Sequence, residues 1–124
     1  MAEYPEFVIT LCHDKANEKQ VTLAFVLGLK GIEKGYKTAI LLMLDGVHVG
    51  VQGYADDIDI GEPFLPVKDM LEVYLGQGGQ LFVCGSCWKH EHLADSDRLA
   101  GVPLISADAV VDYLMNAKTT LQLN

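Results

Sequence analysis

The chain has 124 residues, of which 50% are hydrophobic and 21% are charged, and its formal net charge is −8 at pH 7. This composition is typical of a globular protein with a real core and excludes an intrinsically disordered chain. The acidic balance argues against nonspecific binding to nucleic acid or to an anionic membrane surface, and no apolar run reaches the roughly 18 residues of a membrane span, so we expect neither partner.

Strand-like apolar runs alternate along the chain with helix-like patterns, which is typical of a parallel α/β fold. The run at 38–44 is apolar almost throughout, which favours a central strand covered on both faces. No linker or repeat interrupts the pattern, so we expect a single domain over residues 1–124. The predicted strands are 7–12, 38–44, 80–84, 102–105 and 119–123.

The first predicted helix covers 18–34, with Asn17 as its N-cap and Gly35 as its stop. It is apolar on more than one side, which suggests that it also packs against another subunit. A short helix is expected at about 46–53, followed by a long surface loop. Two further helices are predicted to begin at Pro66 and, with an N-cap, at Ser106.

Polar and reactive residues follow the predicted strands, and in a parallel sheet the strand ends meet at one edge, where ligands usually bind. The residues His13, Asp14 and Asp45 could form a base for catalysis there, although loop contacts and helix capping are the more common use of such residues. The strand ends carry Cys12-His13-Asp14, Asp45-Gly46-Val47-His48, Cys84-Gly-Ser-Cys87 and Ser106.

Cys84 is the candidate nucleophile, because it ends an apolar run and a Gly85-Ser86 turn into a helix start follows it. Backbone N–H groups at such a position favour thiolate over thiol. Cys12 also ends an apolar run, but we interpret it as a small buried hydrophobe. Three cysteines is an odd number, which argues against a disulfide framework and favours a reducing, cytoplasmic setting.

Cys84 and Cys87 form a C-x-x-C pair, which serves elsewhere as a redox dithiol or as half of a metal site. With His90 and His92 the pair supplies four zinc-type ligands, but zinc sites usually join two separated ligand pairs. We therefore expect no metal and no organic cofactor, with His90 and His92 on a solvated face. Trp88 is expected to anchor the short helix.

Seven short segments, spread over nearly the whole chain, form a recognisable set. These segments are Ala16 to Phe25, Asp45-Gly46-Val47, Gly53-Tyr54-Ala55, Gly78-Gly79, Val83-Cys84, Ile105-Ser106 and Val110 to Leu114. By the order and spacing of these segments, the chain resembles the DsrE/DsrF-like family, the sulfur-relay group that includes the TusD proteins.

The resemblance implies a three-layer α/β/α domain with a five-stranded parallel sheet, assembled into trimers or hexamers. It also implies a sulfurtransferase-like persulfide carrier, with Cys84 at the family cysteine and with sulfur donor and acceptor proteins as partners. Cys87 departs from the family pattern and is a candidate resolving thiol. Two other functions stay open, an oligomeric binding or assembly module with structural cysteines and a Cys/His metal site.

Overall fold

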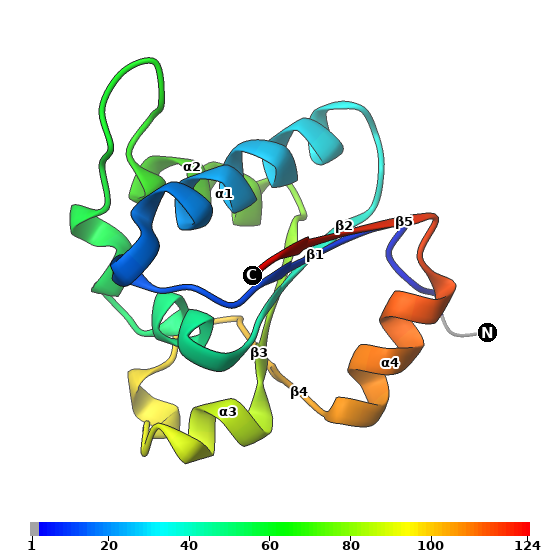
Figure 1. Cartoon of the computed structure of the whole chain (residues 1–124). Helices are drawn as coiled ribbons and strands as arrows, with labels where there is room; N and C mark the ends of the chain where they lie inside the picture. Colours follow the sequence, from blue (N-terminus) through cyan, green and yellow to red (C-terminus); the bar gives the residue numbers. More distant parts are fainter. Residues whose placement is uncertain (1–2) are drawn as a thin grey trace.

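The computed structural model describes residues 3–124 and contains the predicted five-stranded sheet (Figure 1). All strand pairs are parallel and the strand order is β4-β3-β2-β1-β5. The α/β prediction is therefore confirmed. The strands are β1 (Phe7–Leu11), β2 (Thr38–Leu42), β3 (Gln80–Cys84), β4 (Leu104–Ile105) and β5 (Thr119–Leu123).

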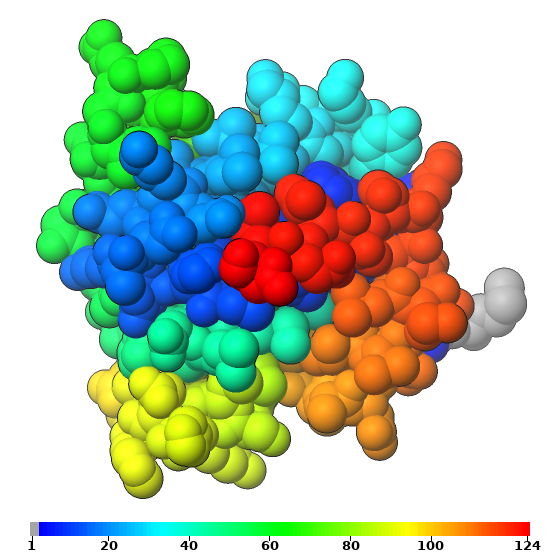
Figure 2. Space-filling model, in the orientation of Figure 1, coloured from blue at the N-terminus to red at the C-terminus, as the bar shows by residue number. Residues whose placement is uncertain are grey.

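The strand β2 lies at the centre of the sheet, and all five of its residues are buried. Its sequence, apolar after Thr38, follows from this position, since helices cover both faces of a central parallel strand. The edge strand β5 is mostly exposed, and it lies open along the face of the molecule shown in Figure 2.

The helices form a layer on each side of the sheet (Figure 1). The helices α1 (Glu18–Glu33) and α2 (Val67–Gly76) pack against each other on one face. The 3₁₀ segment η2 (Leu44–Gly50) and α3 (Gly85–His90) lie on this same face, since Val47, Val49 and Trp88 belong to the same core cluster as residues of α1 and α2. The other face carries α4 (Ala107–Asn116), whose Val110 packs against Val8, Ala39 and Leu41 of the sheet. This arrangement is the three-layer α/β/α architecture.

Local capping contacts begin the helices where the sequence predicts them. The side chain of Asn17 accepts a hydrogen bond from the backbone N–H of Gln20 at 3.3 Å, and Ser106 accepts one from Ala109 at 3.2 Å. Gly35 follows α1 with a φ of 86°, a conformation that favours glycine. These contacts satisfy N–H groups that the first helical turn leaves without partners.

Three predicted strands are longer than the observed ones. β1 ends at Leu11 rather than residue 12. β2 ends at Leu42 rather than residue 44, because Leu44 turns into a left-handed conformation that starts η2. The helix expected at 46–53 is this 3₁₀ segment at Leu44–Gly50. β4 begins at Leu104 rather than residue 102, since Pro103 has no N–H to donate to a ladder.

The long loop predicted after η2 contains the short 3₁₀ segment η3 (Tyr54–Asp57) and then residues 58–66. The part before α2 projects from the surface, as Figure 2 shows in green. Phe64 and Leu65 on this projection are 40% and 59% exposed. Among residues 3–124, no helix is both long and apolar enough to cross a membrane.

Candidate functional site

Cys84 is the last residue of β3, where it pairs with Ile105 of the neighbouring strand β4. Its side chain belongs to the main hydrophobic core and is only 9% exposed. The next residue begins α3, so the thiol lies where a strand turns directly into a helix, as the sequence predicts. The burial of Cys84 shields its sulfur from most of the solvent.

Cys87 lies one helical turn later and is partly exposed. It lines an open pocket of about 370 Å³ between the start of η2 and the helix α3. The other residues that line this pocket are Leu44, Asp45, Ser86, His90 and Glu91. The two thiols of the C-x-x-C pair therefore differ in access, because Cys87 borders the pocket while Cys84 is buried.

Leu44 brings the backbone into contact with Cys87. Its N–H donates a hydrogen bond to the sulfur of Cys87 across 3.2 Å. Leu44 has a φ of 52°, which is strained for a residue with a side chain, and that side chain is 62% exposed. The strained turn therefore aims an N–H group at a sulfur atom rather than burying a leucine.

The environment of Cys87 makes its thiol a weaker acid than usual. Burial raises the pKa of Cys87, and the neighbouring Cys84 thiol adds to that rise. The N–H of Leu44 acts in the opposite direction and lowers the pKa of Cys87, since it donates to the sulfur. Cys87 is therefore mostly protonated at neutral pH.

Cys12, at the end of β1, joins the two other thiols at this edge of the sheet, close enough for its charge to act on Cys87. The structure leaves Cys12 partly exposed, whereas the sequence predicts a buried residue. Burial and the carboxylate of Asp45 both raise the pKa of Cys12. All three cysteines in the described part of the chain are free thiols.

His48 connects three segments beside the pocket. Its Nδ1 lies 3.2 Å from a carboxylate oxygen of Asp14, and its Nε2 lies 3.1 Å from one of Glu91. The ring also stacks on Tyr54, with 5.8 Å between the ring centroids. These contacts link the end of β1, the segment η2 and the end of α3, so His48 holds the wall of the pocket in place.

Asp14 caps a helix, which is a common structural role for an aspartate in a loop, and it also contacts His48. Its carboxylate accepts a hydrogen bond from the backbone N–H of Ala16 at 2.9 Å and so caps η1 (Lys15–Asn17). His13 and Asp45 are not joined to Asp14 by any side-chain hydrogen bond that the structure records. A base built from these three residues therefore has no support in the geometry.

The Cys/His metal site also has no support. Within the described range 3–124, no three His, Cys, Asp or Glu side chains gather as a metal ion would require. His90 and His92 are exposed, and His90 borders the pocket. Trp88 is 1% exposed in the main core, which confirms that it anchors α3.

The sequence predicts the position of both thiols but misses the residues that organise their surroundings. Leu44 is indistinguishable in the sequence from the strand that precedes it, and its left-handed turn depends on tertiary packing. His48 is visible only as one of several polar residues after β2, and its partner Glu91 is far away in sequence. Long-range contacts of this kind leave no local signal.

The protein is of the class in which a three-layer α/β/α domain with a parallel sheet carries a cysteine at the end of a strand. The chain belongs to the DsrE/DsrF-like family, whose model matches residues 6–123. Its sequence is 25% identical over 116 residues to an uncharacterized protein of Methanopyrus kandleri, covering 92% of each chain. The resemblance stated from the sequence is thereby confirmed.

Solved structures share the fold. The ychN protein from E. coli superposes with a TM-score of 0.72 and 20% identity, covering 95% of this chain and 98% of that one. A protein of unknown function from Methanobacterium thermoautotrophicum gives a TM-score of 0.69 and 16% identity, covering 97% and 99% of the two chains. At this level of identity the likeness concerns the fold alone.

Proposed function

We propose that this protein is a cytoplasmic sulfur carrier that holds sulfur as a persulfide on Cys84, with Cys87 as the resolving thiol. One observation carries the proposal furthest: two free thiols lie at the end of β3 and in the helix that follows, one buried in the core and the other lining an open pocket. Membership of the DsrE/DsrF-like family, which includes sulfur-relay proteins, supports the same function.

The first step is thiol exchange and needs no cofactor. The thiolate of Cys84 attacks the outer sulfur of a donor persulfide, so that a new S–S bond forms on Cys84 and the donor's S–S bond breaks. The donor leaves as a thiolate, and no electrons are gained or lost overall. Burial of Cys84 then shields the persulfide from water and from stray reductants.

Delivery to an acceptor protein is the same exchange in reverse, with an acceptor thiolate taking the outer sulfur. Cys87 offers a second route, because its thiolate can attack the inner sulfur, the Sγ of Cys84. A Cys84–Cys87 disulfide then forms, and the outer sulfur leaves as hydrosulfide with two electrons. A dithiol reductant restores the two thiols.

The raised pKa of Cys87 supports this division of roles. A resolving thiol that stays protonated attacks slowly, because the thiolate is the nucleophile. The persulfide therefore persists long enough to meet an acceptor. A fast resolving thiol would discharge the sulfur as hydrosulfide before transfer.

The proposal includes sulfur donor and acceptor proteins as partners and a homo-oligomer, either a trimer or a hexamer. Exposed apolar side chains on two helices support the self-association. Leu23 of α1 is 37% exposed, while Val111 and Met115 of α4 are 57% and 78% exposed. Val111 and Met115 lie one helical turn apart on α4, and exposed apolar patches on soluble proteins often mark contact surfaces.

Peptide mapping by mass spectrometry tests the carrier role after incubation with inorganic polysulfide and a rapid alkylating quench. We expect one additional sulfur on the peptide that carries Cys84. The Cys87→Ser variant should keep this sulfur longer, whereas Cys12→Ser is a control that loads like the wild type. If the Cys84→Ser variant gained as much sulfur as the wild type, the result would contradict the proposal.

An oligomeric binding or assembly module with structural cysteines is the second candidate, and the burial of Cys84 is the observation that favours it. Native thiol labelling separates the two candidates. A carrier exposes Cys84 to small electrophiles on the time scale of loading. A structural Cys84 would be labelled no faster than the rate at which the whole chain unfolds.

A further inference from the structure

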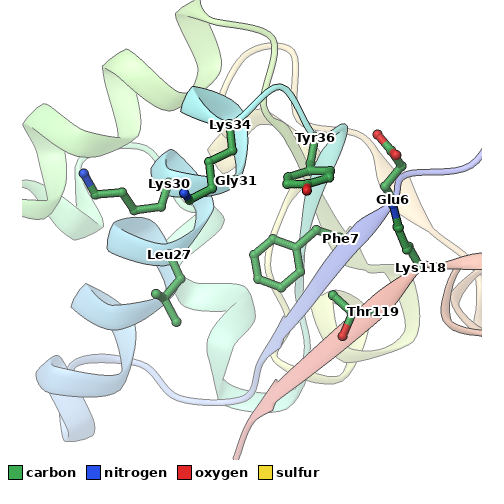
Figure 3. A pocket seen from close by; sticks show the side chains of 9 residues that line it. All are labelled: Glu6, Phe7, Leu27, Lys30, Gly31, Lys34, Tyr36, Lys118 and Thr119. Atoms are coloured by element: carbon green, nitrogen blue, oxygen red, sulfur yellow. The ribbon is translucent and has the colours of Figure 1, made fainter.

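A second pocket lies at the opposite edge of the sheet from the thiols. It has a volume of about 420 Å³ and lies where β1 and β5 begin, beside the last turns of α1 (Figure 3). Phe7 and Thr119, the first residues of these two strands, pair with each other and both line the pocket. Nothing in the sulfur-carrier chemistry uses this site.

The walls of this pocket are mainly apolar. The rings of Phe7 and Tyr36 and the side chain of Leu27 face it, as Figure 3 shows, and Tyr36 is 42% exposed. Gly31 brings α1 close to the sheet here, because an added Cβ would lie 2.5 Å from the hydroxyl of Thr38. The wall is therefore a built surface in which helix and strands meet closely, and it is open to solvent.

Positive charge surrounds this apolar surface, although the chain as a whole is acidic. Lys30, Lys34 and Lys118 line the pocket against a single carboxylate, that of Glu6. That carboxylate already accepts a hydrogen bond from the backbone N–H of Lys37 at 3.1 Å. An anion in the pocket would therefore meet an excess of cationic side chains.

Two of the lysines have no carboxylate partner among residues 3–124, so their charge is available to such an anion. Lys30 lies 3.1 Å from Glu33, so part of its charge is neutralised. Lys118 instead lies above the ring of Tyr36, 5.6 Å from its centroid. Lys34 forms no ion pair with any residue of the described range 3–124. The free charges therefore lie on both sides of the aromatic wall, one on α1 and one beside β5.

We infer that this pocket binds a small anionic aromatic molecule, whose flat body packs against Phe7 and Tyr36 and whose acidic group reaches Lys34 or Lys118. The volume falls within the range of about 300–1,000 Å³ that is usual for small-molecule sites. Apolar walls with a few charged groups at the rim are the usual composition of such sites. A carboxylate, sulfonate or phosphate supplies the complementary charge.

Fluorescence titration of the full chain with anilinonaphthalene sulfonate tests this inference. N-phenylnaphthylamine, which has the same rings without the sulfonate, is the matched neutral probe. We expect saturable binding of one sulfonate probe per chain, weaker binding of the neutral probe, and loss of affinity as ionic strength rises. Equal affinity for the two probes would show that the lysines do not bind the acidic group, and the inference would fail.

Charge-reversal variants locate the bound probe. Lys34→Glu should weaken sulfonate binding on the order of fivefold, a change typical of one exposed charge contact. Lys19→Glu makes the same change on the same helix outside the pocket and should leave affinity unchanged. Lys118→Glu is the equivalent change beside β5. Equal affinities in wild type, Lys34→Glu, Lys118→Glu and Lys19→Glu would place the probe elsewhere and overturn the inference.

A third variant separates a ligand site from a contact between copies of the chain. Thr119→Trp fills the pocket at an exposed strand position and should abolish sulfonate binding while the sedimentation mass stays unchanged. A Thr119→Trp chain that keeps its sulfonate affinity but dissociates into smaller species would show that a second copy occupies this surface, and the inference would fail.

Discussion

Cys87 is held by two neighbours whose effects on its thiol oppose each other. The thiol of Cys84 disfavours a thiolate on Cys87, while the N–H of Leu44 stabilises one from 3.2 Å away. Burial, the largest of these effects, also disfavours the thiolate, so the pKa of Cys87 lies above its ordinary value. The acidity of Cys87 is thus a property of the whole turn rather than of the cysteine alone.

The pH dependence of alkylation follows from this raised pKa. At neutral pH we predict that Cys87 reacts with iodoacetamide more slowly than a free cysteine, because only the thiolate reacts. Its rate should rise through a midpoint above the ordinary thiol value. In Cys84→Ala the midpoint should move to lower pH, since the effect of the neighbouring thiol is gone, while burial keeps the pKa raised.

Site-resolved mass spectrometry after timed labelling measures this profile for each cysteine separately. Cys12 serves as an internal comparison, because burial and Asp45 raise its pKa for reasons independent of Cys84. A Cys87 midpoint below that of a free thiol in the wild type would contradict the burial of this sulfur.

The left-handed turn at Leu44 predicts an unusual order of stabilities. Glycine tolerates a φ of 52° without strain, whereas alanine does not, so Leu44→Gly should be more stable than Leu44→Ala by about 1 kcal/mol. The leucine side chain is 62% exposed, so both variants lose little packing. Urea unfolding measures the difference. Equal stability of the two variants would mean that this turn is not strained.

At the scale of elements, the connection between α2 and β3 controls where the cysteine strand lies. Tyr74 of α2 is fully buried, and its hydroxyl lies 2.6 Å from the carbonyl oxygen of Gln80 and 3.1 Å from that of Thr38. The ring packs edge-on against Phe25 of α1. One side chain therefore ties α1 and α2 to the first residues of β2 and β3.

Gly79 lets the backbone pass directly beneath the Tyr74 ring. A Cβ at this position would lie 2.5 Å from the ring, so we predict that Gly79→Ala destabilises the fold by about 1–3 kcal/mol through overpacking. Gly76→Ala is the matched control, because nothing lies within 4 Å of its added Cβ. It should be neutral or slightly stabilising.

Chemical denaturation of the two glycine variants measures this difference in the free energy of unfolding. If Gly79→Ala unfolded at the same denaturant concentration as Gly76→Ala, the close approach of Gly79 to the Tyr74 ring would be contradicted. The path of the chain into Cys84 would then need revision.

At the scale of the whole molecule, the sequence predicts the features that depend on neighbouring residues or on burial, which are the helix caps and the buried strands. Asn17 and Ser106 cap their helices as predicted, since a cap depends on neighbours three residues away. The buried strand β2 is visible because helices cover both its faces. The parallel sheet and the thiol at the end of β3 follow from the same patterns.

The surroundings of the thiols, which the sequence does not predict, depend on contacts between distant segments. Leu44 and Cys87 are 43 positions apart in the sequence, and so are His48 and Glu91, so no local pattern predicts either contact. The partial exposure of Cys12 likewise depends on how η2 packs beside β1. The pocket is assembled from these contacts, which is why its shape appears only in the structure.

Exposed apolar surface predicts the behaviour of the molecule in solution. Met115 is 78% exposed and Val111 57% exposed on α4, which favours burial against another copy. We expect sedimentation equilibrium at micromolar concentration to give a multiple of the 13.6 kDa chain mass. The variant Met115→Lys tests the α4 surface. A wild-type mass equal to one chain would contradict self-association.

Cyanolysis of the loaded protein tests the sulfur-carrier proposal most directly. The protein is incubated with polysulfide, freed of excess donor, and treated with cyanide, which converts outer persulfide sulfur to thiocyanate. We predict about one thiocyanate per chain from the wild type and from Cys12→Ser, because each keeps one shielded carrier thiol. Cys84→Ser should yield none, and a yield from Cys84→Ser equal to that of the wild type would contradict the proposal that Cys84 carries the sulfur.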